Sequence, residues 1–366
     1  MREADRRALP GIPDRRIECV SQLPELLRVA AARLPKAQSL ASRLMYEGKA
    51  KFDRAVAARL AASASDVVVG QYGSAAETLS IARQTGRLGV LNFVSSHPQY
   101  RNQYLREMAG LTEGHHELVS ARTAAAIQAE IDSADLILVP SRFVARQLQE
   151  LGVSDDKIAL EPYGVDLSAF RPAEDETTGS RSQLPLVCLY VGQISYRKGI
   201  RVLIEAARRL PASKCQFTLI GPLVSPDVLK DLPENCKWLG ASVHGEVAAA
   251  MRHADIFILP SIDDAYPLVT LEAMASGLAV IVSDHAGTNE LITDGEDGLV
   301  VPAGDPDAIV RALERLMQTD GLVKDTGQAA RRTVSKGNSW DEYGARVLTR
   351  LTGNPPASNG SLRKES

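Results

Sequence analysis

The sequence predicts an α/β protein with two doubly wound domains, each built on a parallel sheet that helices cover on both faces. The chain has 366 residues, which is more than one hydrophobic core usually covers. Short apolar runs alternate with helical patterns, as expected of successive βα units. The alternation stops in a stretch rich in Gly, Pro, Ser and acids (163–185) and then starts again. Such a stretch is typical of a linker between two domains.

Apolar runs of the length of short buried strands occur in both halves of the chain. In the first half they are 66–70, 88–95, 135–141 and 157–162, with a helical stretch at 142–151. In the second half they are 186–192, 216–221, 255–261, 279–283 and 298–302. Ligands of doubly wound sheets bind beyond the carboxyl ends of the strands. We therefore expect the functional residues in the loops that follow these runs.

A helix is predicted at 306–317, because Asp305 suits the N-cap and Pro306 suits the first helical position. Its apolar face consists of Ile309, Ala312, Leu313, Leu316 and Met317. The D-x-D pattern of Asp305 and Asp307 can also indicate a metal site, but capping explains both acids. No metal is expected here.

The composition is that of an ordinary globular protein, with 45% hydrophobic and 24% charged residues. The net charge of −3 provides no general attraction to nucleic acid. No apolar run is long enough to span a membrane and the N-terminus lacks a signal peptide, so we expect a cytoplasmic protein. The cysteines show no metal-site spacing and are expected to be reduced thiols without disulfides. They are Cys19, Cys188, Cys215 and Cys236.

The stretch 263–277, DDAYPLVTLEAMASG, predicts a loop followed by a helix. Pro267 suits the first helical position, and Gly277 suits the C-terminal stop. The helix start then lies at the ligand-facing edge of the sheet. There the free amides of Leu268 and Val269 would bind a phosphate.

Two carboxylates of this stretch can converge on one ligand. Asp264 lies in the loop, and Glu272 lies one turn beyond Leu268 on the same helical face. A carboxylate offers two acceptors to a pair of vicinal hydroxyls, and sugars present such pairs. The alternative is that Glu272 is an exposed position of an amphipathic helix and that Asp263 and Asp264 are solvated loop acids.

The segment 191–199, VGQISYRKG, follows the first strand of the second domain and precedes a helix. Gly192 at the strand end lets a ligand approach the backbone. Arg197 and Lys198 place cations where that ligand would lie, and cations near a helix start are disfavoured unless an anion compensates them. A diphosphate would be such an anion. The alternative is two basic residues at a solvated helix start.

The segments 191–199, 254–292 and 294–309, in this order, resemble the donor domain of the family 4 glycosyltransferases of the GT-B fold. The resemblance continues more weakly through 134–172 and covers the chain from about residue 60. It implies two Rossmann-like domains that face a central cleft, and sugar transfer with retention of the anomeric configuration. The domains expected from it are an acceptor-side domain at 1–166, a linker at 167–185, a donor domain at 186–337, a helix at 338–353 that crosses back to the first domain, and a disordered tail at 354–366.

The resemblance also implies roles for individual residues. Glu272 would bind the ribose of a nucleotide sugar, and Asp264 would lie near the sugar hydroxyls, where the family usually has Glu. Lys198 would bind the diphosphate and stabilise the charge of the leaving group. Gln193 stands at the family's usual arginine position, so one cation is missing unless Arg197 substitutes for it. The expected donor-binding set is Gly192, Gln193, Arg197, Lys198, Ser242, Ala265, Pro267, Leu268, Val269 and Glu272.

By the same resemblance, His97 ends the run 92–97 near the transferred sugar and completes a catalytic set with Lys198 and Asp264. A histidine at a strand end is alternatively a structural or solvated residue. The segment 339–351 resembles the last helix of the fold, with Trp340 as its anchor.

The first domain departs most from the family pattern. Residues 1–20 offer neither the first strand nor the glycine-rich loop of its relatives, so we expect the first domain to lack its first strand. Residues 28–59 carry more cations than acids, which suits contact with anionic lipid. The alternative is a solvated helical face. The cations are Arg28, Arg33, Lys36, Arg43, Lys49, Lys51, Arg54 and Arg59.

The leading prediction is an enzyme of polysaccharide or glycolipid biosynthesis. It would move a hexose from a nucleoside-diphosphate sugar to a saccharide or lipid-linked acceptor, with no metal ion or other cofactor and no nucleic-acid partner. We expect it in the cytoplasm, with peripheral contact at the inner face of the membrane. The alternative is a degenerate, non-catalytic nucleotide-sugar-binding protein that is the partner of another transferase. That alternative is supported by the missing N-terminal elements, by Gln193 and by Asp264.

Overall fold

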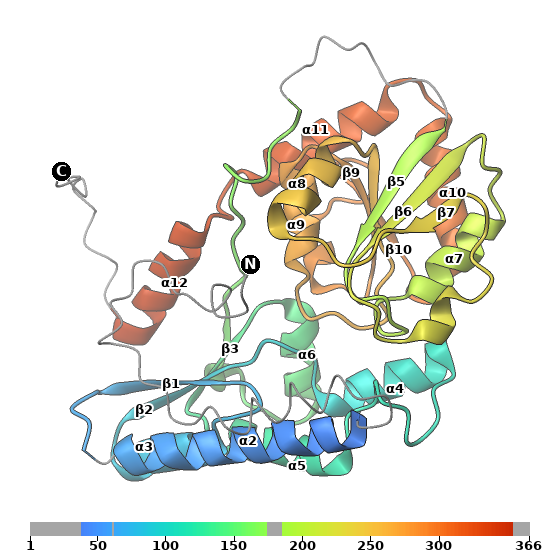
Figure 1. The fold of residues 1–366 in the computed structure, drawn as a ribbon. Coiled ribbons are helices and arrows are strands. Elements are labelled where there is room, and N and C mark those ends of the chain that lie inside the picture. Colours follow the sequence, from blue (N-terminus) through green and yellow to red (C-terminus); the bar gives the residue numbers. More distant parts are fainter. Residues whose placement is uncertain (1–37, 61, 174–184, 354–366) are drawn as a thin grey trace. The chain divides into compact units, whose positions relative to one another are not determined.

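The computed structural model describes residues 38–60, 62–173 and 185–353, with side chains described from residue 46 onward (Figure 1). The chain divides into two compact units. The first compact unit is Met1–Leu91 with Ala125–Asp135, and the second is Asn92–Ala124 with Leu136–Ser366. The domain boundaries expected from the resemblance stay a prediction. The absence of a first strand and the disorder of the tail concern residues outside the described ranges.

The first compact unit contains α2 (Gln38–Leu60), β1 (Val67–Gln71), α3 (Ala76–Gln84) and most of β2 (Leu88–Asn92) and α5 (Ala121–Ser133). Buried carboxylates fix its turns. Asp53 accepts hydrogen bonds from the amides at the start of α3, Glu77 N at 2.8 Å and Thr78 N at 2.9 Å. Glu130 accepts from Gly73 N and Ala75 N, and burial raises the pKa of its carboxyl.

The basic surface predicted for residues 28–59 is described only in part. Lys49, Lys51, Arg54 and Arg59 lie on α2, and all four are exposed there. Arg28, Arg33 and Lys36 lie outside the described residues, and the side chain of Arg43 is not described. No described helix is both long and apolar enough to cross a membrane.

The second compact unit begins with α4 (Pro98–Ala109), β3 (Leu136–Val139), α6 (Arg142–Glu150) and β4 (Ile158–Leu160). Strands β3 and β4 pair in parallel, with Leu138 opposite Ala159. The order of the four-stranded sheet is β1-β2-β3-β4. Each strand lies within or overlaps one of the apolar runs predicted for the first half of the chain.

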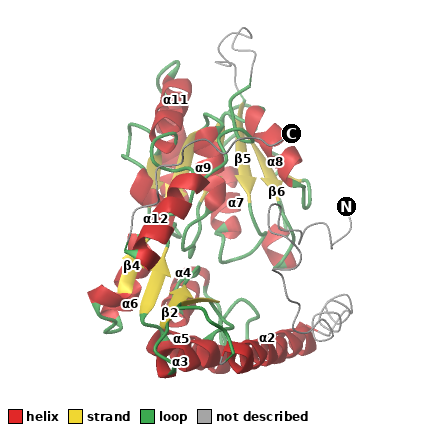
Figure 2. Ribbon diagram, turned by 90° about the vertical axis from the view of Figure 1, so that its left-hand side faces the viewer, coloured by secondary structure: helices red, strands yellow, loops and turns green. Residues whose placement is uncertain are grey.

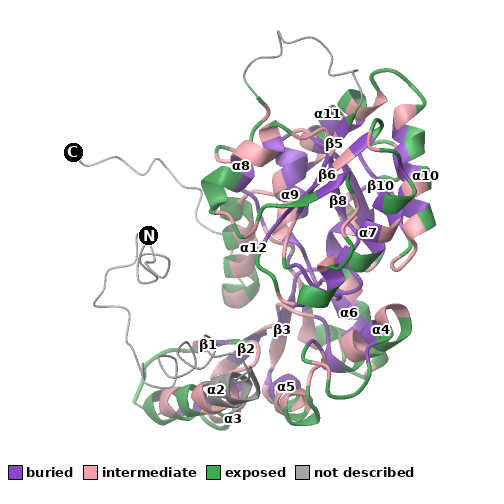
Figure 3. Ribbon diagram, turned by 45° about the vertical axis from the view of Figure 1, so that its right-hand side comes forward, coloured by how far each residue is buried: buried purple, intermediate pink, exposed green. Residues whose placement is uncertain are grey.

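A six-stranded sheet forms the core of the second compact unit. Its strands are β5 (Leu186–Val191), β6 (Cys215–Ile220), β7 (Cys236–Trp238), β8 (Ile256–Leu259), β9 (Ala279–Ser283) and β10 (Leu299–Val301). Strands β8 and β9 are buried throughout, as expected of a parallel sheet covered on both faces (Figure 3). The strand β7 was not predicted, because two of its three residues are exposed and it shows no apolar run.

The strand order β10-β9-β8-β5-β6-β7 places a topological switch point between β5 and β8. The chain leaves β5 toward β6 and β7, and then returns to β8 on the other side of β5. At such a point the loops after the two central strands diverge and leave a crevice for a ligand. Here these loops are 192–199 and 260–267.

Helices cover both faces of this sheet. They are α7 (Ile200–Arg208), α8 (His244–Arg252), α9 (Leu268–Ala275), α10 (Pro306–Met317) and α11 (Leu322–Val334). Helix α7 packs against α10, and α9 packs against α11 on the opposite face (Figure 1). The prediction for α10 is confirmed, because Pro306 is its first residue and the Asp305 carboxylate accepts from Ala308 N at 3.0 Å. Among the described residues no acidic, His or Cys cluster is arranged to hold a metal.

The last helix, α12 (Trp340–Thr352), confirms the helix predicted at 339–351. Its Arg346 and Arg350 pair with Glu161, which follows β4, at 3.4 and 3.3 Å. Figure 2 shows α12 beside the end of β4. Trp340 stacks on Tyr163 with ring centroids 6.1 Å apart, although 44% of Trp340 stays exposed. These contacts join the C-terminal helix to the segment that follows the first sheet.

The thiols Cys188, Cys215 and Cys236 are free and buried on the neighbouring strands β5, β6 and β7. Burial raises the pKa of Cys236 to about 12. The reduced state of these thiols stays a prediction, and Cys19 lies outside the described residues.

Candidate active site

The two loops at the topological switch point are hydrogen-bonded to each other within the second compact unit. Ile262 N donates to Arg197 O at 2.9 Å, and Arg197 Nη1 donates to Asp263 O at 2.9 Å. Gly199 allows this approach, because its φ is 71° and a Cβ there would lie 1.8 Å from Pro260 O. The side chains of 193–198 are thereby held next to those of 263–264.

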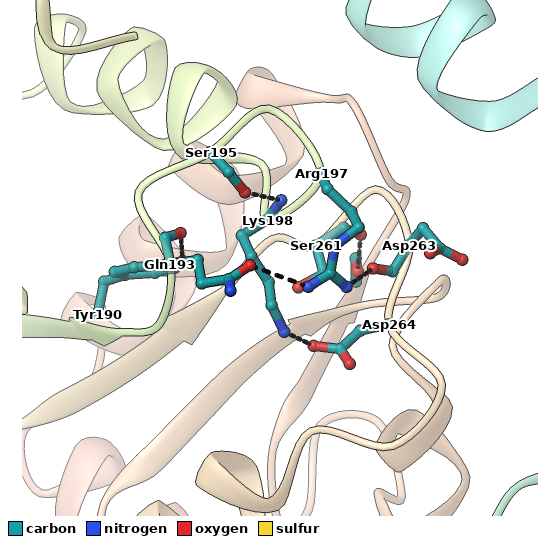
Figure 4. Close-up of polar contacts among 9 residues, drawn as sticks. Tyr190, Gln193, Ser195, Arg197, Lys198, Ser261, Asp263 and Asp264 are labelled. Atoms are coloured by element: carbon teal, nitrogen blue, oxygen red, sulfur yellow. Dashed lines mark hydrogen bonds and ion pairs between the residues drawn. The ribbon is translucent and has the colours of Figure 1, made fainter. Parts of the chain in front are cut away.

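An ion pair joins these loops at the centre of the candidate site (Figure 4). Lys198 Nζ donates to Asp264 Oδ2, and the two side chains are only 13% and 12% exposed. Burial lowers the pKa of the Lys198 ammonium, although the charge of Asp264 acts in the opposite direction. The backbone of Asp264 is fixed as well, since its N–H donates to His285 O at 3.1 Å and its carbonyl accepts from Gly287 N at 2.9 Å.

Arg197 lies beside Gln193, the residue at the expected arginine position. Arg197 Nη2 is 3.4 Å from Gln193 Oε1, and Tyr190 Oη donates to Gln193 O at 2.7 Å (Figure 4). The structure thus brings Gln193, Arg197, Lys198 and Asp264 together. Gly192 lies at the end of β5, as expected.

The start of α9 differs by one residue from the prediction. Pro267 is the N-cap and not the first helical residue, because its ψ of 104° is extended and its carbonyl accepts from Thr270 N at 3.0 Å. The helix begins at Leu268. Within the described ranges the structure shows no acceptor for the amides of Leu268 and Val269. The expected pair of free donors at this helix start is therefore present.

Glu272 is half-buried on α9, and its carboxylate makes no hydrogen bond or ion pair with the described residues. Burial alone raises the pKa of this carboxyl to about 7. The alternative in which Asp263 and Asp264 are solvated loop acids is wrong, because both are buried and Asp263 is only 1% exposed. No contact joins the carboxylates of Glu272 and Asp264, so their convergence on one ligand stays a prediction.

His97 is the N-cap of α4. Its Nδ1 accepts from Gln99 N at 3.2 Å, and its own N–H donates to Gln147 Oε1 at 3.0 Å. These contacts give the buried histidine a structural role, and its catalytic role stays a prediction. Ser242 lies shortly before α8. Ala265 is buried, and its carbonyl accepts from Ser141 Oγ at 2.7 Å.

A third carboxylate, Glu117, holds the loop that carries Arg197 and Lys198. It lies between α4 and α5, is 5% exposed, and accepts from Tyr196 N at 2.9 Å, from Arg197 N at 2.8 Å and from Ser225 Oγ. No local pattern in the sequence indicated this role, because the carboxylate acts on amides about eighty positions further along the chain.

We expect Glu117→Gln to weaken both the fold and the donor site. A glutamine cannot accept from both amides in the same way, and a buried N–H without an acceptor costs about 1–3 kcal/mol of unfolding free energy. Because the loop of Lys198 is then less well fixed, the Kd for the donor should rise as well. Isothermal titration calorimetry and thermal unfolding check the two effects. Asp305→Ala is the control: it removes a distant cap worth about 1 kcal/mol, and its donor Kd should not change.

Comparison with known proteins shows which family the loops of this site resemble. Residues 174–333, which include both loops, match the family described as "Glycosyl transferases group 1". This part of the chain, which is less than half of its length, is similar to the group 1 glycosyltransferases. The putative colanic acid biosynthesis glycosyltransferase WcaL of Salmonella typhimurium is 30% identical over 273 residues, which are 70% of this chain and 62% of WcaL.

Solved structures of similar fold cover a larger share of this chain. Sucrose-phosphate synthase from Thermosynechococcus elongatus has a TM-score of 0.69 at 21% identity and covers 84% of this chain and 78% of that one. Anabaena HepE, solved with UDP and glucose, has a TM-score of 0.65 at 14% identity and covers 92% and 98%. The predicted GT-B fold with two parallel sheets is confirmed.

Proposed function

We propose that this chain transfers a hexose from a nucleoside-diphosphate sugar to a saccharide or lipid-linked acceptor, with retention of the anomeric configuration and without a metal ion. The observation that carries the proposal is the buried Lys198–Asp264 pair at the switch point of the donor-side sheet. A cation and a carboxylate held there suit a substrate that combines a diphosphate with sugar hydroxyls.

The donor would replace the ion pair between Lys198 and Asp264. Asp264 neutralises Lys198 in the absence of a ligand. A diphosphate next to Lys198 and the amides of Leu268 and Val269 would take over that neutralisation. Asp264 would then accept from the sugar hydroxyls, and Glu272, which has no partner in the described residues, would accept from the two hydroxyls of the ribose.

Catalysis in this proposal rests on charge stabilisation. The bond from the anomeric carbon to the diphosphate oxygen breaks, and its electron pair passes to that oxygen. An acceptor hydroxyl forms the new bond to the anomeric carbon, and its proton passes to the departing diphosphate. Lys198, with Arg197 beside it, would stabilise the new charge, and one preorganised donor of this kind is worth about 10²- to 10³-fold in kcat. His97 would lie near the transferred sugar. Positioning of both substrates would supply much of the remaining rate.

Two comparisons guide the choice of substrates. WcaL is named for colanic acid biosynthesis, which favours a saccharide or lipid-linked saccharide as the acceptor. HepE was solved with UDP and glucose, so UDP sugars are the first donors to try. The exposed cations of α2, Lys49, Lys51, Arg54 and Arg59, suit peripheral contact with an anionic membrane from the cytoplasm.

The second candidate function is a non-catalytic nucleotide-sugar-binding protein. It is favoured by Gln193 at the position of the missing arginine, beside an Arg197 that already donates to Asp263 O. Incubation with UDP, GDP and ADP sugars, with and without acceptor mixtures, separates the candidates. Release of nucleoside diphosphate supports the enzyme, and NMR of the product then gives its anomeric configuration. Donor binding without release in every mixture supports the binding protein instead.

A further inference from the structure

A groove of about 620 Å³ runs along α11, away from the Lys198–Asp264 pair. We call it the α11 groove. One wall is made by Lys324, Gln328, Arg331, Arg332, Ser335 and Lys336. The opposite wall contains Pro172 and Gly277, and a Cβ added at Gly277 would lie 3.3 Å from Pro172 Cγ. The volume lies in the range of small-molecule sites, about 300–1,000 Å³.

The described lining of the α11 groove is basic and contains no carboxylate. Arg331 has a structural role, since its guanidinium donates to Ala275 O at the end of α9 and to Phe170 O at 3.4 Å. Lys324, Arg332 and Lys336 are exposed and make no ion pair with any residue in the described ranges. Their charge is therefore available to a ligand.

Helix stability does not account for this set of cations. Arg332 lies in the last turn of α11, where the helix dipole favours a cation. Lys324 lies in the first turn, where the dipole disfavours one. It shares a helix face with the neutral Gln328 and with Arg332 at spacings of four residues, so this face of α11 carries two cations and no acid. An anion in the groove would compensate these charges.

We infer that the α11 groove binds a ligand that carries two or more phosphate groups. Lys324 and Arg332 are eight positions apart, which is about 12 Å along a helix axis, so they can contact separate phosphates. Gln328 and Ser335 add neutral hydrogen-bond donors between and beside the cations. The phosphates come either from a soluble oligophosphate or from neighbouring headgroups of an anionic membrane. This inference does not depend on the proposed transfer reaction.

Every protein in the test is the full chain and carries K198Q/D264N as a common background. This background removes Lys198 from the candidate active site, so that this lysine does not bind phosphate there. One arm titrates inorganic tripolyphosphate by calorimetry. The other sediments the protein with phosphatidylcholine vesicles that contain phosphatidylglycerol, and with pure phosphatidylcholine as reference. Each arm compares K324Q/R332Q/K336Q with R106Q/K230Q/K237Q, which removes the same charge from positions elsewhere on the chain. Glutamine is a good helix former, so α11 should stay folded.

We expect the K198Q/D264N protein to bind in at least one arm. Its affinity should be about tenfold weaker with K324Q/R332Q/K336Q added, and should change less than twofold with R106Q/K230Q/K237Q added. Tripolyphosphate binding identifies a soluble ligand, and binding to vesicles alone identifies headgroups. If the triple variant does not fold, K324Q/K336Q should show an intermediate loss. Binding in neither arm, or equal binding by the triple variant and its control, overturns the inference.

Discussion

Replacing Glu272 by glutamine should stabilise the protein at pH 8 and leave its stability at pH 5 almost unchanged. Burial raises the pKa of this carboxyl from 4.5 to about 7. A carboxyl whose folded-state pKa is raised favours the folded state when it is protonated, and that contribution is lost as the pH rises from about 4.5 through 7. At pH 8 the ionised side chain therefore costs about 3 kcal/mol, which a neutral glutamine avoids.

Thermal unfolding of the full chain at both pH values measures this effect, and a rise of several degrees is expected at pH 8 alone. Glu314→Gln is the matched control, because Glu314 is exposed on α10 and makes no ion pair with the described residues. An equal shift in both variants, or a shift that is also present at pH 5, would show that burial of Glu272 is not the cause.

The same substitution should weaken donor binding about 10- to 100-fold at pH 8, because a charge-assisted hydrogen bond contributes about 1.5–3 kcal/mol. Wild-type affinity should fall as the pH is lowered from 8 to 6 and Glu272 becomes protonated, whereas Glu272→Gln should lack that dependence. A variant that is more stable but binds less tightly is typical of a binding residue: the protein tolerates a buried charge that lowers its stability, because that charge binds the ligand. Unchanged affinity in Glu272→Gln would remove this residue from the site.

Lys198→Met should lower kcat at saturating donor by about 10²- to 10³-fold. The variant lacks a preorganised cation at the proposed leaving group, which is worth about 2.7–4 kcal/mol in the transition state. It should also lose stability, because removal of one partner of a buried pair leaves the Asp264 charge uncompensated at a cost of about 3–5 kcal/mol. Steady-state kinetics and thermal unfolding give the two quantities.

The double variant Lys198→Met/Asp264→Asn separates these effects. With both charges removed, most of the lost stability should return, since neither side chain is left charged and buried. Activity should stay low, because the cation is still missing. A double variant that regains activity along with stability would mean that Lys198 acts only on the fold.

Much of the fold followed from periodicity in the sequence, because the central strands are buried on both faces and read as unbroken apolar runs. The strand at 279–283 matches β9 residue for residue, and Asp305 with Pro306 located the start of α10. The edge strand β7 lacked this signal, since only one of its three residues is buried. Pro267 was placed one residue too far into α9, because proline suits both positions and only the backbone ψ separates them.

For the site, sequence reasoning succeeded where topology alone brings residues together. Lys198 and Asp264 follow strands that lie side by side in the sheet, so a prediction based on strand ends placed both at one edge. Glu117 and the capping contact of His97 depend on how distant segments pack, and they left no pattern of spacing. Glu117 lies in the long segment between α4 and α5, and the tertiary structure alone determines which amides its carboxylate binds. The residues next to it in the sequence therefore could not predict this role.

The three described thiols of the six-stranded sheet provide a built-in probe of its opening. Cys188, Cys215 and Cys236 are all buried, so a maleimide reaches them only when the core around the sheet opens. With Cys19 replaced by serine, the rate of alkylation would report how often this sheet opens. Comparison with and without donor would measure that opening directly, without any attached fluorophore.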